Sequence, residues 1–392
     1  MLTSIALILL LGLLLGSLFT KAKLPGLLGM ILTGIILSPH ALNLIDSSIL
    51  NISADLRQIA LIIILTRAGL SLNISDLKNA GRPAVLMCFI PACAEIIGTL
   101  ILAPVLLNVT VLEAAIIGSV IAAVSPAVIV PRMIELIEKG YGRKHSIPQI
   151  ILAGASVDDV FVIVLFTSFT ALAATGTLSV GSFLKIPASI LTGIATGAAV
   201  GALLVIFFKK FHMRDSVKIL ILLSISFLSL ELQSRLEEII PISGLLAVMS
   251  LGITIKQKYS ALAVRLSSKY NKLWVVAEIF LFVLVGATVD LKYAAIAGIK
   301  TALLITGALF FRMLGVAISL IKTKLTRKER VFCMLAYTPK ATVQAAIGAI
   351  PLTMGLSCGQ TVLTTAVLSI LITAPFGAIC IDSMYQKLLD RI

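Results

Sequence analysis

The sequence predicts an all-helical polytopic membrane protein whose thirteen transmembrane helices form two inverted repeats. The chain of 392 residues is 59% hydrophobic and only 13% charged, and its apolar runs recur from Leu2 almost to the last residue. Most runs reach or approach the ~20 residues that a helix needs to cross a hydrocarbon core. Short motifs also recur at a constant offset of seven spans. The length and recurrence of the apolar runs exclude both a soluble globular protein and an interfacial anchor.

The first apolar run, Leu2 to Phe19, lacks the basic segment that precedes the apolar core of a cleaved signal peptide, and Lys21 and Lys23 follow it. We therefore expect it to stay as the first span. The spans are expected at residues 2–19, 25–44, 55–72, 84–107, 113–137, 147–172, 187–208, 219–233, 242–255, 273–291, 301–321, 331–353 and 359–385.

Basic residues are distributed very unevenly between the predicted loops. The odd-numbered loops and the C-terminal tail carry 23 Lys or Arg residues, whereas the N-terminus and the even-numbered loops carry 4. The positive-inside rule then places the N-terminus outside and the C-terminus in the cytoplasm, in a protein of the cell membrane. These loops also explain the net charge of +14. We therefore expect membrane lipid, and no nucleic acid, as a partner.

The 5 cysteines and 3 histidines form no pattern with metal-ligand spacing. The cysteines lie mostly within spans, where they are expected to pack as small apolar side chains. No cofactor and no resident metal site are predicted.

The second half of the chain repeats motifs of the first half. Three motif pairs share one offset: Gly26-Leu27-Leu28 and Gly34 with Gly244-Leu245-Leu246 and Gly252, Gly69 with Gly286, and Ser125-Pro126 with Thr338-Pro339. Because the offset is an odd number of spans, the two halves are expected to have opposite orientations in the membrane. Inverted repeats of this kind are typical of secondary transporters that work by alternating access.

Three prolines fall in the middle of paired spans, Pro126 and Pro131 in the fifth and Pro339 in the twelfth. Proline removes a backbone donor and disfavours helix in the residue before it, so both spans are expected to break near the midplane. The breaks would expose backbone carbonyls beside Ser125 and Thr338. We interpret these two unwound, crossed segments as the lining of an ion site.

Five charged residues lie near the middle of predicted spans: Glu95, Asp158, Asp159, Arg312 and Lys340. A charge at this depth costs roughly 2.5 to 3.5 kcal/mol on insertion scales, so each needs a partner or a function. The formal charges leave an excess of −1, which one proton or one bound monovalent cation would neutralise.

Adjacent helical residues point about 100° apart, so Asp158 and Asp159 cannot face the same partner. One aspartate is expected to hold a structural contact. The other is expected to bind a metal cation, and protons compete with that cation for the same carboxylate. Glu95 and Arg312 are expected to form a static ion pair. Two interpretations of Lys340 remain open: it compensates the negative end of a half-helix, or it pairs with an aspartate and exchanges a proton.

Several motifs together resemble the monovalent cation/proton antiporters, and within them the NHA branch of sodium/proton exchangers. They are Ser156-Val157-Asp158-Asp159-Val160, the run from Thr338 to Ala346, the mid-helix Arg312, and Pro91 with Glu95. The resemblance implies the sodium/proton antiporter fold. It also implies that Asp159 is the indispensable carrier of sodium or proton, and that Asp158 assists it or pairs with a basic residue.

The resemblance further implies a homodimer in which core helices move against a scaffold and expose the aspartates to either side. The implied division is scaffold and dimerisation helices at 1–80 and 216–292, a linker helix at 181–210, and core helices at 83–175 and 300–385.

The predicted function is exchange of Na⁺ or Li⁺ for H⁺, in the service of pH homeostasis. Electrogenic members of the family carry lysine where this chain resembles them at Arg312, and electroneutral members usually have Asn in place of Asp158. Because Arg312 cannot release a proton, we expect one-for-one, electroneutral exchange.

Two other transport functions remain as alternatives. The first is K⁺/H⁺ exchange, and the second is sodium-coupled symport of an organic anion, which would need two sodium sites. An aspartyl protease is disfavoured, because its aspartates must face each other from separate helices.

Overall fold

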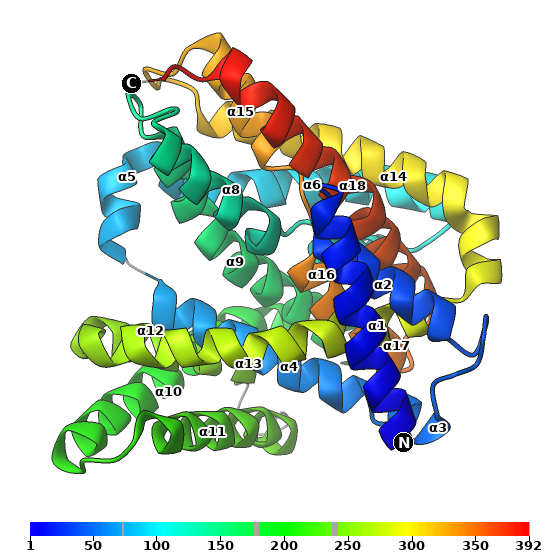
Figure 1. Ribbon diagram of the computed structural model, residues 1–392, viewed down its shortest axis with the longest axis horizontal. Coiled ribbons are helices and arrows are strands. Elements are labelled where there is room, and N and C mark those ends of the chain that lie inside the picture. Colours follow the sequence, from blue (N-terminus) through cyan, green and yellow to red (C-terminus); the bar gives the residue numbers. More distant parts are fainter. Residues whose placement is uncertain (73, 176–179, 237–241, 392) are drawn as a thin grey trace. The chain divides into compact units, whose positions relative to one another are not determined.

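The computed structural model in Figure 1 describes residues 1–72, 74–175, 180–236 and 242–391, and in these residues every regular element is a helix. The predicted fold class is thereby confirmed. The helices are α1 (Leu2–Lys21), α2 (Gly26–Leu37), α3 (Ser47–Asn51), α4 (Ser53–Ser71), α5 (Ile74–Met87), α6 (Ile90–Leu107), α7 (Val111–Ile121), α8 (Pro126–Lys139), α9 (Ile147–Thr175), α10 (Val180–Lys210), α11 (Asp215–Leu236), α12 (Gly244–Lys258), α13 (Ser260–Ala287), α14 (Leu291–Ser319), α15 (Arg327–Ala336), α16 (Thr342–Ile347), α17 (Ile350–Thr353) and α18 (Gly359–Leu388).

Each of the thirteen predicted spans overlaps at least one of these helices. In the described residues, 8 helical segments are long and apolar enough to cross a membrane by length and composition. The count of thirteen crossings therefore stays a prediction. The second span was predicted too long, because α2 ends at Leu37. Ser38 precedes a proline and adopts an extended conformation with ψ 160°, which ends the helix.

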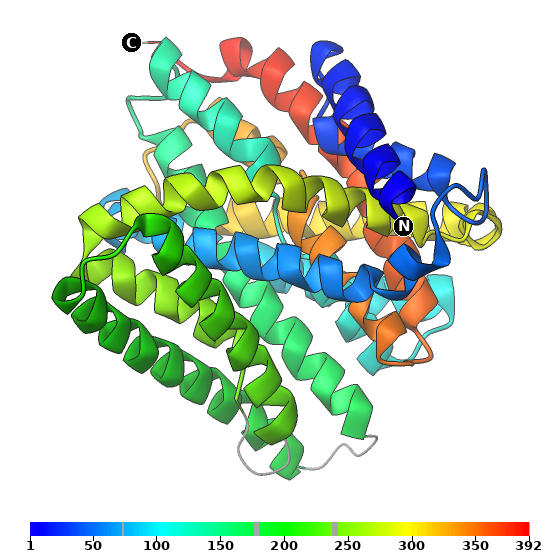
Figure 2. The same cartoon turned by 60° about the horizontal axis from the view of Figure 1, so that its bottom comes forward.

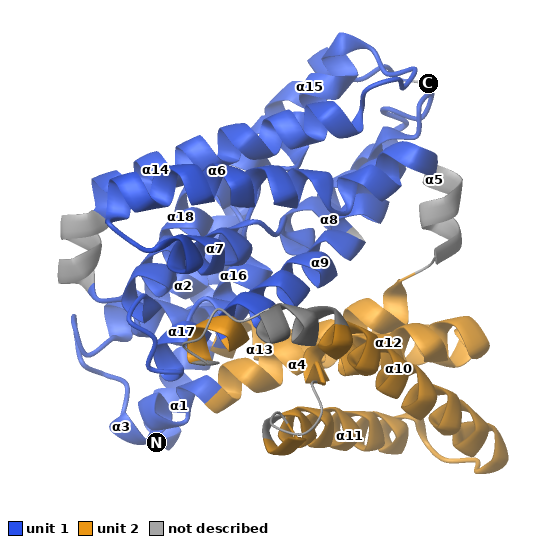
Figure 3. Ribbon diagram, turned by 180° about the vertical axis from the view of Figure 1, so that it is seen from behind, with its two compact units in different colours: residues 1–54, 75–170, 281–392 blue, residues 55–74, 171–280 orange. Residues whose placement is uncertain are grey.

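The chain divides into two compact units, which are coloured separately in Figure 3. The first unit comprises residues 1–54, 75–170 and 281–392, and the second comprises residues 55–74 and 171–280. Compactness does not test motion, so the division into a moving core and a scaffold stays a prediction.

Within the first unit, α6 packs along α14, and small residues let the two helices approach closely. A Cβ built at Gly98 would lie 2.5 Å from the Phe311 ring, and one at Gly315 would lie 2.7 Å from the Cα of Pro91. These helices carry Glu95 and Arg312, so their close packing brings the two side chains together. A cluster of buried side chains that includes Ile129, Phe332 and Tyr337 packs beside them.

Within the second unit, α10 and α11 both pack against α12, and the three helices lie side by side in Figures 1 and 2. Three small residues of α10, Gly193, Gly197 and Gly201, form a stripe that lets α10 approach α12 closely. A Cβ at Gly193 would lie 2.6 Å from the carbonyl oxygen of Ser243, and a Cβ at Gly197 would collide with that of Ala247.

We expect Gly197→Leu to destabilise the second unit by about 1–3 kcal/mol or more, because the new side chain would meet backbone that cannot turn away. Ala199→Leu is the matched control, since Ala199 lies on the exposed face of α10. Thermal unfolding of the purified protein in detergent measures both variants. Equal melting temperatures for the two variants would contradict the packing argument.

The sequence repeat is visible in how the helices cross. In the first unit, a Cβ at Gly286 would lie 3.2 Å from the Cα of Gly34. In the second unit, a Cβ at Gly252 would lie 3.0 Å from the Cα of Gly69. Because the repeat pairs Gly34 with Gly252 and Gly69 with Gly286, these two crossings are equivalent under the repeat, and each joins the first half of the chain to the second.

The helices α7 and α15 each begin with a capping box of their own. The sequence signature of this motif, Thr-x-x-Glu, is present at both positions but was not used above. Thr110 caps α7 with Glu113, and Thr326 caps α15 with Glu329. Glu329 also contacts His145, with 2.8 Å between its Oε1 and the ring Nδ1. Burial alone would raise the pKa of the Glu329 carboxyl, but hydrogen bonds from His145 and Thr326 outweigh it and lower that pKa. Both broken helices thus begin at a firmly fixed residue.

Candidate functional site

Two helices of the first unit are interrupted, and their interruptions cross. The first break separates α7, which ends at Ile121, from α8, which begins at Pro126; the second separates α15 from α16 between Ala336 and Thr342. The backbone N–H of Ser125 donates to the carbonyl of Pro339 at 2.8 Å, which joins the two breaks directly. The breaks predicted at Pro126 and Pro339 are present.

The prediction of a break at Pro131 is wrong. Pro131 lies inside α8, which continues to Lys139. A proline within a helix removes a single hydrogen bond, and a packed membrane helix tolerates that loss. Pro126 occupies the first turn, where its missing donor costs nothing, and it marks the end of the unwound segment.

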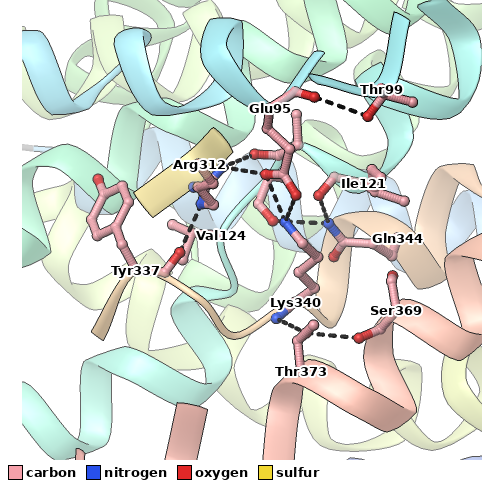
Figure 4. Close-up of polar contacts among 12 residues, drawn as sticks. Glu95, Thr99, Ile121, Val124, Arg312, Tyr337, Lys340, Gln344, Ser369 and Thr373 are labelled. Atoms are coloured by element: carbon pink, nitrogen blue, oxygen red, sulfur yellow. Dashed lines mark hydrogen bonds and ion pairs between the residues drawn. The ribbon is translucent and has the colours of Figure 1, made fainter. Parts of the chain in front are cut away.

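Arg312 of α14 is fully buried and contacts both breaks (Figure 4). Its Nε donates to the carbonyl of Tyr337 at 2.7 Å, and one terminal nitrogen donates to the carbonyl of Ala122. The same nitrogen lies 3.0 Å from Glu95 Oε2, and the other lies 2.9 Å from Asp158 Oδ2. The planar guanidinium has five donors, so it can hold two carbonyls and two carboxylates at once. The expected Glu95–Arg312 ion pair is present.

Lys340 also pairs with Glu95. Its Nζ lies 2.7 Å from Oε1 and 2.8 Å from Oε2 of that carboxylate, and both side chains are fully buried. Its backbone N–H donates to Thr373 Oγ1 at 3.0 Å. In this arrangement Lys340 is paired with a glutamate of α6, and the interpretation that pairs it with an aspartate does not describe the structure.

The two aspartates of α9 have different surroundings. Asp158 is fully buried, and its Oδ2 accepts from Arg312 and from the backbone N–H of Val124 at 2.8 Å. Asp159 forms no ion pair with any residue that the structure describes, and its Oδ1 is buried without a hydrogen-bond partner. Glu95 and Asp158 balance Arg312 and Lys340, so the excess charge of −1 belongs to Asp159.

Of the two predicted hydroxyl ligands, Ser125 is buried and its Oγ has no hydrogen-bond partner. Thr338 is also buried; its hydroxyl donates to the carbonyl of Leu335 at 2.8 Å, and the lone pairs of its oxygen remain available to a cation. Small, hard cations prefer oxygen atoms as ligands. Among the predicted ligands, Ser125, Asp158 and Asp159 each have a buried oxygen without a hydrogen-bond partner, and these oxygens are the strongest candidates.

Sequence reasoning assigned no role to Gln344, although it lies in the run that follows Lys340. Its Nε2 donates to the carbonyl of Ala123 at 2.9 Å and lies 3.5 Å from that of Ile121 (Figure 4). The signal that was available is its amide group, in a half-helix whose other residues are apolar except for Thr342.

Comparisons with known proteins agree with this geometry. The family model described as "Sodium/hydrogen exchanger, transmembrane" matches residues 5–386. The human protein sodium/hydrogen exchanger 9B2 is 31% identical over 388 residues, which cover 95% of this chain and 71% of that protein. Human sodium/hydrogen exchanger 9B1 is 31% identical over 381 residues, which cover 94% of this chain and 73% of that protein.

The fold is similar to that of the sodium proton antiporter MjNhaP1 from Methanocaldococcus jannaschii. The two structures superpose with a TM-score of 0.83 at 22% identity, over 98% of this chain and 97% of that one. Together, the full-length match to the family model and the identity to the two human exchangers establish that this chain belongs to the sodium/hydrogen exchanger family.

Proposed function

We propose that this protein exchanges Na⁺ or Li⁺ for H⁺ across the membrane by alternating access, and that Asp159 carries either ion. The observation that carries the proposal is the position of Asp159, whose carboxylate has no countercharge in a cluster that is otherwise neutral. A proton or one monovalent cation completes the charge balance. Because both neutralise the same carboxylate, binding of one displaces the other, and this competition is an antiport mechanism.

The charged neighbours support a one-for-one exchange. Arg312 keeps its proton under all physiological conditions and is held by four groups. Both oxygens of Glu95 are close to Lys340, so the ammonium is stabilised as a static countercharge. No proton beyond that of Asp159 is then needed in the cycle, and the exchange is electroneutral.

The relatives favour this function over the two alternatives, since they are named sodium/hydrogen exchangers. K⁺/H⁺ exchange is the second candidate, because the same competition would serve a larger cation. A sodium-coupled symporter would need a second cation site, and an excess charge of −1 accommodates one. The proposal includes a homodimer in the cell membrane with its N-terminus outside and its C-terminus in the cytoplasm.

Proteoliposomes with a pH-sensitive dye inside test the proposal. Addition of Na⁺ or Li⁺ is expected to drive proton movement, and K⁺ is expected to drive little. The equilibrium position should not change when a membrane potential is imposed in either direction. A response to K⁺ alone would overturn the cation assignment, and an equilibrium that shifts with potential would overturn the one-for-one stoichiometry.

A further inference from the structure

The neutral side chain of Gln344 joins the two broken helices. The charge balance of the site gives this side chain no role. Gln344 of α16 is 1% exposed, and its Nε2 donates to the carbonyl of Ala123 in the other break at 2.9 Å. The same nitrogen lies 3.5 Å from the carbonyl of Ile121, at the end of α7. Its Oε1 is buried without a hydrogen-bond partner. Both amide hydrogens thus face backbone carbonyls, one at the end of α7 and one in the break that follows it.

The orientation of this amide follows from its surroundings. If oxygen and nitrogen were exchanged, the side-chain oxygen would face the carbonyl oxygens of Ile121 and Ala123, and an acceptor would oppose two acceptors. The network therefore assigns the NH₂ group to the carbonyls, which is the basis on which such amides are assigned.

The first break exposes backbone groups that a continuous helix would satisfy internally. Each finds a partner elsewhere in the fold: Ala122 O with Arg312, Ala123 O with Gln344, Val124 N with Asp158, and Ser125 N with Pro339 O. Among these partners, Arg312 and Asp158 belong to the charged cluster. Gln344 holds the backbone between their two contacts and adds no charge.

We propose that Gln344 is a positioning residue that sets the affinity and the discrimination of the cation site. It fixes the segment that carries Val124 and Ser125. The N–H of Val124 orients the Asp158 carboxylate, and Ser125 offers its free hydroxyl, so Gln344 acts on the ligands around Asp159 without contacting the ion. This inference rests on the proposed function and deepens it.

Discrimination between cations depends on cavity size, ligand number and flexibility. A segment held at Ala122, Ala123 and Val124 keeps its oxygens at a fixed spacing, which favours one ionic radius. A segment that has lost the contact at Ala123 can adjust its oxygens to cations of several radii, and it binds each of these cations less tightly. The carrier Asp159 and the charge balance are unchanged, so the maximal rate should change little.

The test compares the wild type with Gln344→Met, which keeps the shape but removes both donors, and with Gln344→Glu. A glutamate donates to the Ala123 carbonyl only while it is protonated. Thr364→Val is the matched control, because Thr364 is 2% exposed and its Oγ1 has no hydrogen-bond partner. KM and maximal rate for Na⁺ and Li⁺ are measured in proteoliposomes over a range of pH and normalised to the amount of folded protein.

For Gln344→Met we expect the KM for Na⁺ to rise about tenfold, the factor that corresponds to one hydrogen bond. The ratio of the two KM values should move towards one, and the maximal rate should stay within about twofold of the wild type. For Gln344→Glu, the KM should be close to the wild-type value at low pH and exceed it increasingly as pH rises. Thr364→Val should keep the wild-type KM values.

Wild-type KM values in Gln344→Met, with only the amount of folded protein reduced, would show a purely structural role and overturn the inference. If Gln344→Met does not fold, Gln344→Glu decides the question: a KM that follows the wild-type pH dependence throughout would overturn the inference. Failure of the wild type to exchange Na⁺ for H⁺ would overturn the proposed function instead, so the two failures are distinguishable.

Discussion

Asp159→Asn is expected to abolish exchange completely while leaving the fold intact. Asparagine has nearly the same shape, and Asp159 has no ion pair that the substitution would break in the described part of the chain. The amide cannot take up a proton or supply the negative charge that a cation needs. The structural cluster of Glu95, Asp158, Arg312 and Lys340 stays neutral.

Asp158→Asn is the informative comparison for this first prediction, since it changes the neighbouring residue by the same chemistry. Asp158 accepts from Arg312 and from Val124, so its substitution is expected to lower the thermal stability. Exchange by proteoliposomes and unfolding in detergent separate the two effects. Substantial exchange in Asp159→Asn, at any pH, would show that another group carries the ions.

Arg312→Met is expected to cause the largest loss of stability. It leaves Glu95 with Lys340 alone, leaves Asp158 buried without a countercharge, and frees the carbonyls of Tyr337 and Ala122. Removing one member of a buried ion pair typically costs about 3–5 kcal/mol. We expect little folded protein from this variant, as measured by the yield of monodisperse protein and its melting temperature.

Two further variants test the reason for this loss. Arg312→Lys keeps the charge, but an ammonium has three donors on a flexible stem and cannot hold the four acceptors that the guanidinium fork holds. It should remain clearly less stable than the wild type. The double variant Arg312→Met with Asp158→Asn removes the uncompensated carboxylate and should recover part of the loss. Wild-type stability in Arg312→Met would contradict the account of the cluster.

The sequence predicted those features that follow from periodicity, composition and local chemistry. Apolar runs gave the helices, because a membrane allows few other structures. The matched glycines Gly34 with Gly252 and Gly69 with Gly286 indicated the repeat, and in the structure they form two equivalent crossings that each join the first half to the second. Pro126 and Pro339 marked the two breaks because proline acts on its own immediate backbone.

The features that were missed or left open depend on which groups meet in space. Lys340 and Glu95 are 245 residues apart in sequence, and only the packing of α6 beside the breaks brings them together. The interaction of Gln344 with Ala123 depends on the same crossing. Pro131 was predicted as a break from the chemistry of proline alone. Whether a proline interrupts a helix also depends on the packing of neighbouring helices, which the sequence does not show.

The central claim is that Asp159 alone carries the excess charge of the site, so that one cation replaces one proton. The most direct test is the number of protons released per Na⁺ bound, measured by titration calorimetry of the purified protein in buffers with different ionisation enthalpies. At a pH where the free carboxyl is protonated, the account predicts a release close to one proton per Na⁺ and no Na⁺ binding by Asp159→Asn. Proton-coupled Na⁺ binding that persists in Asp159→Asn would contradict it.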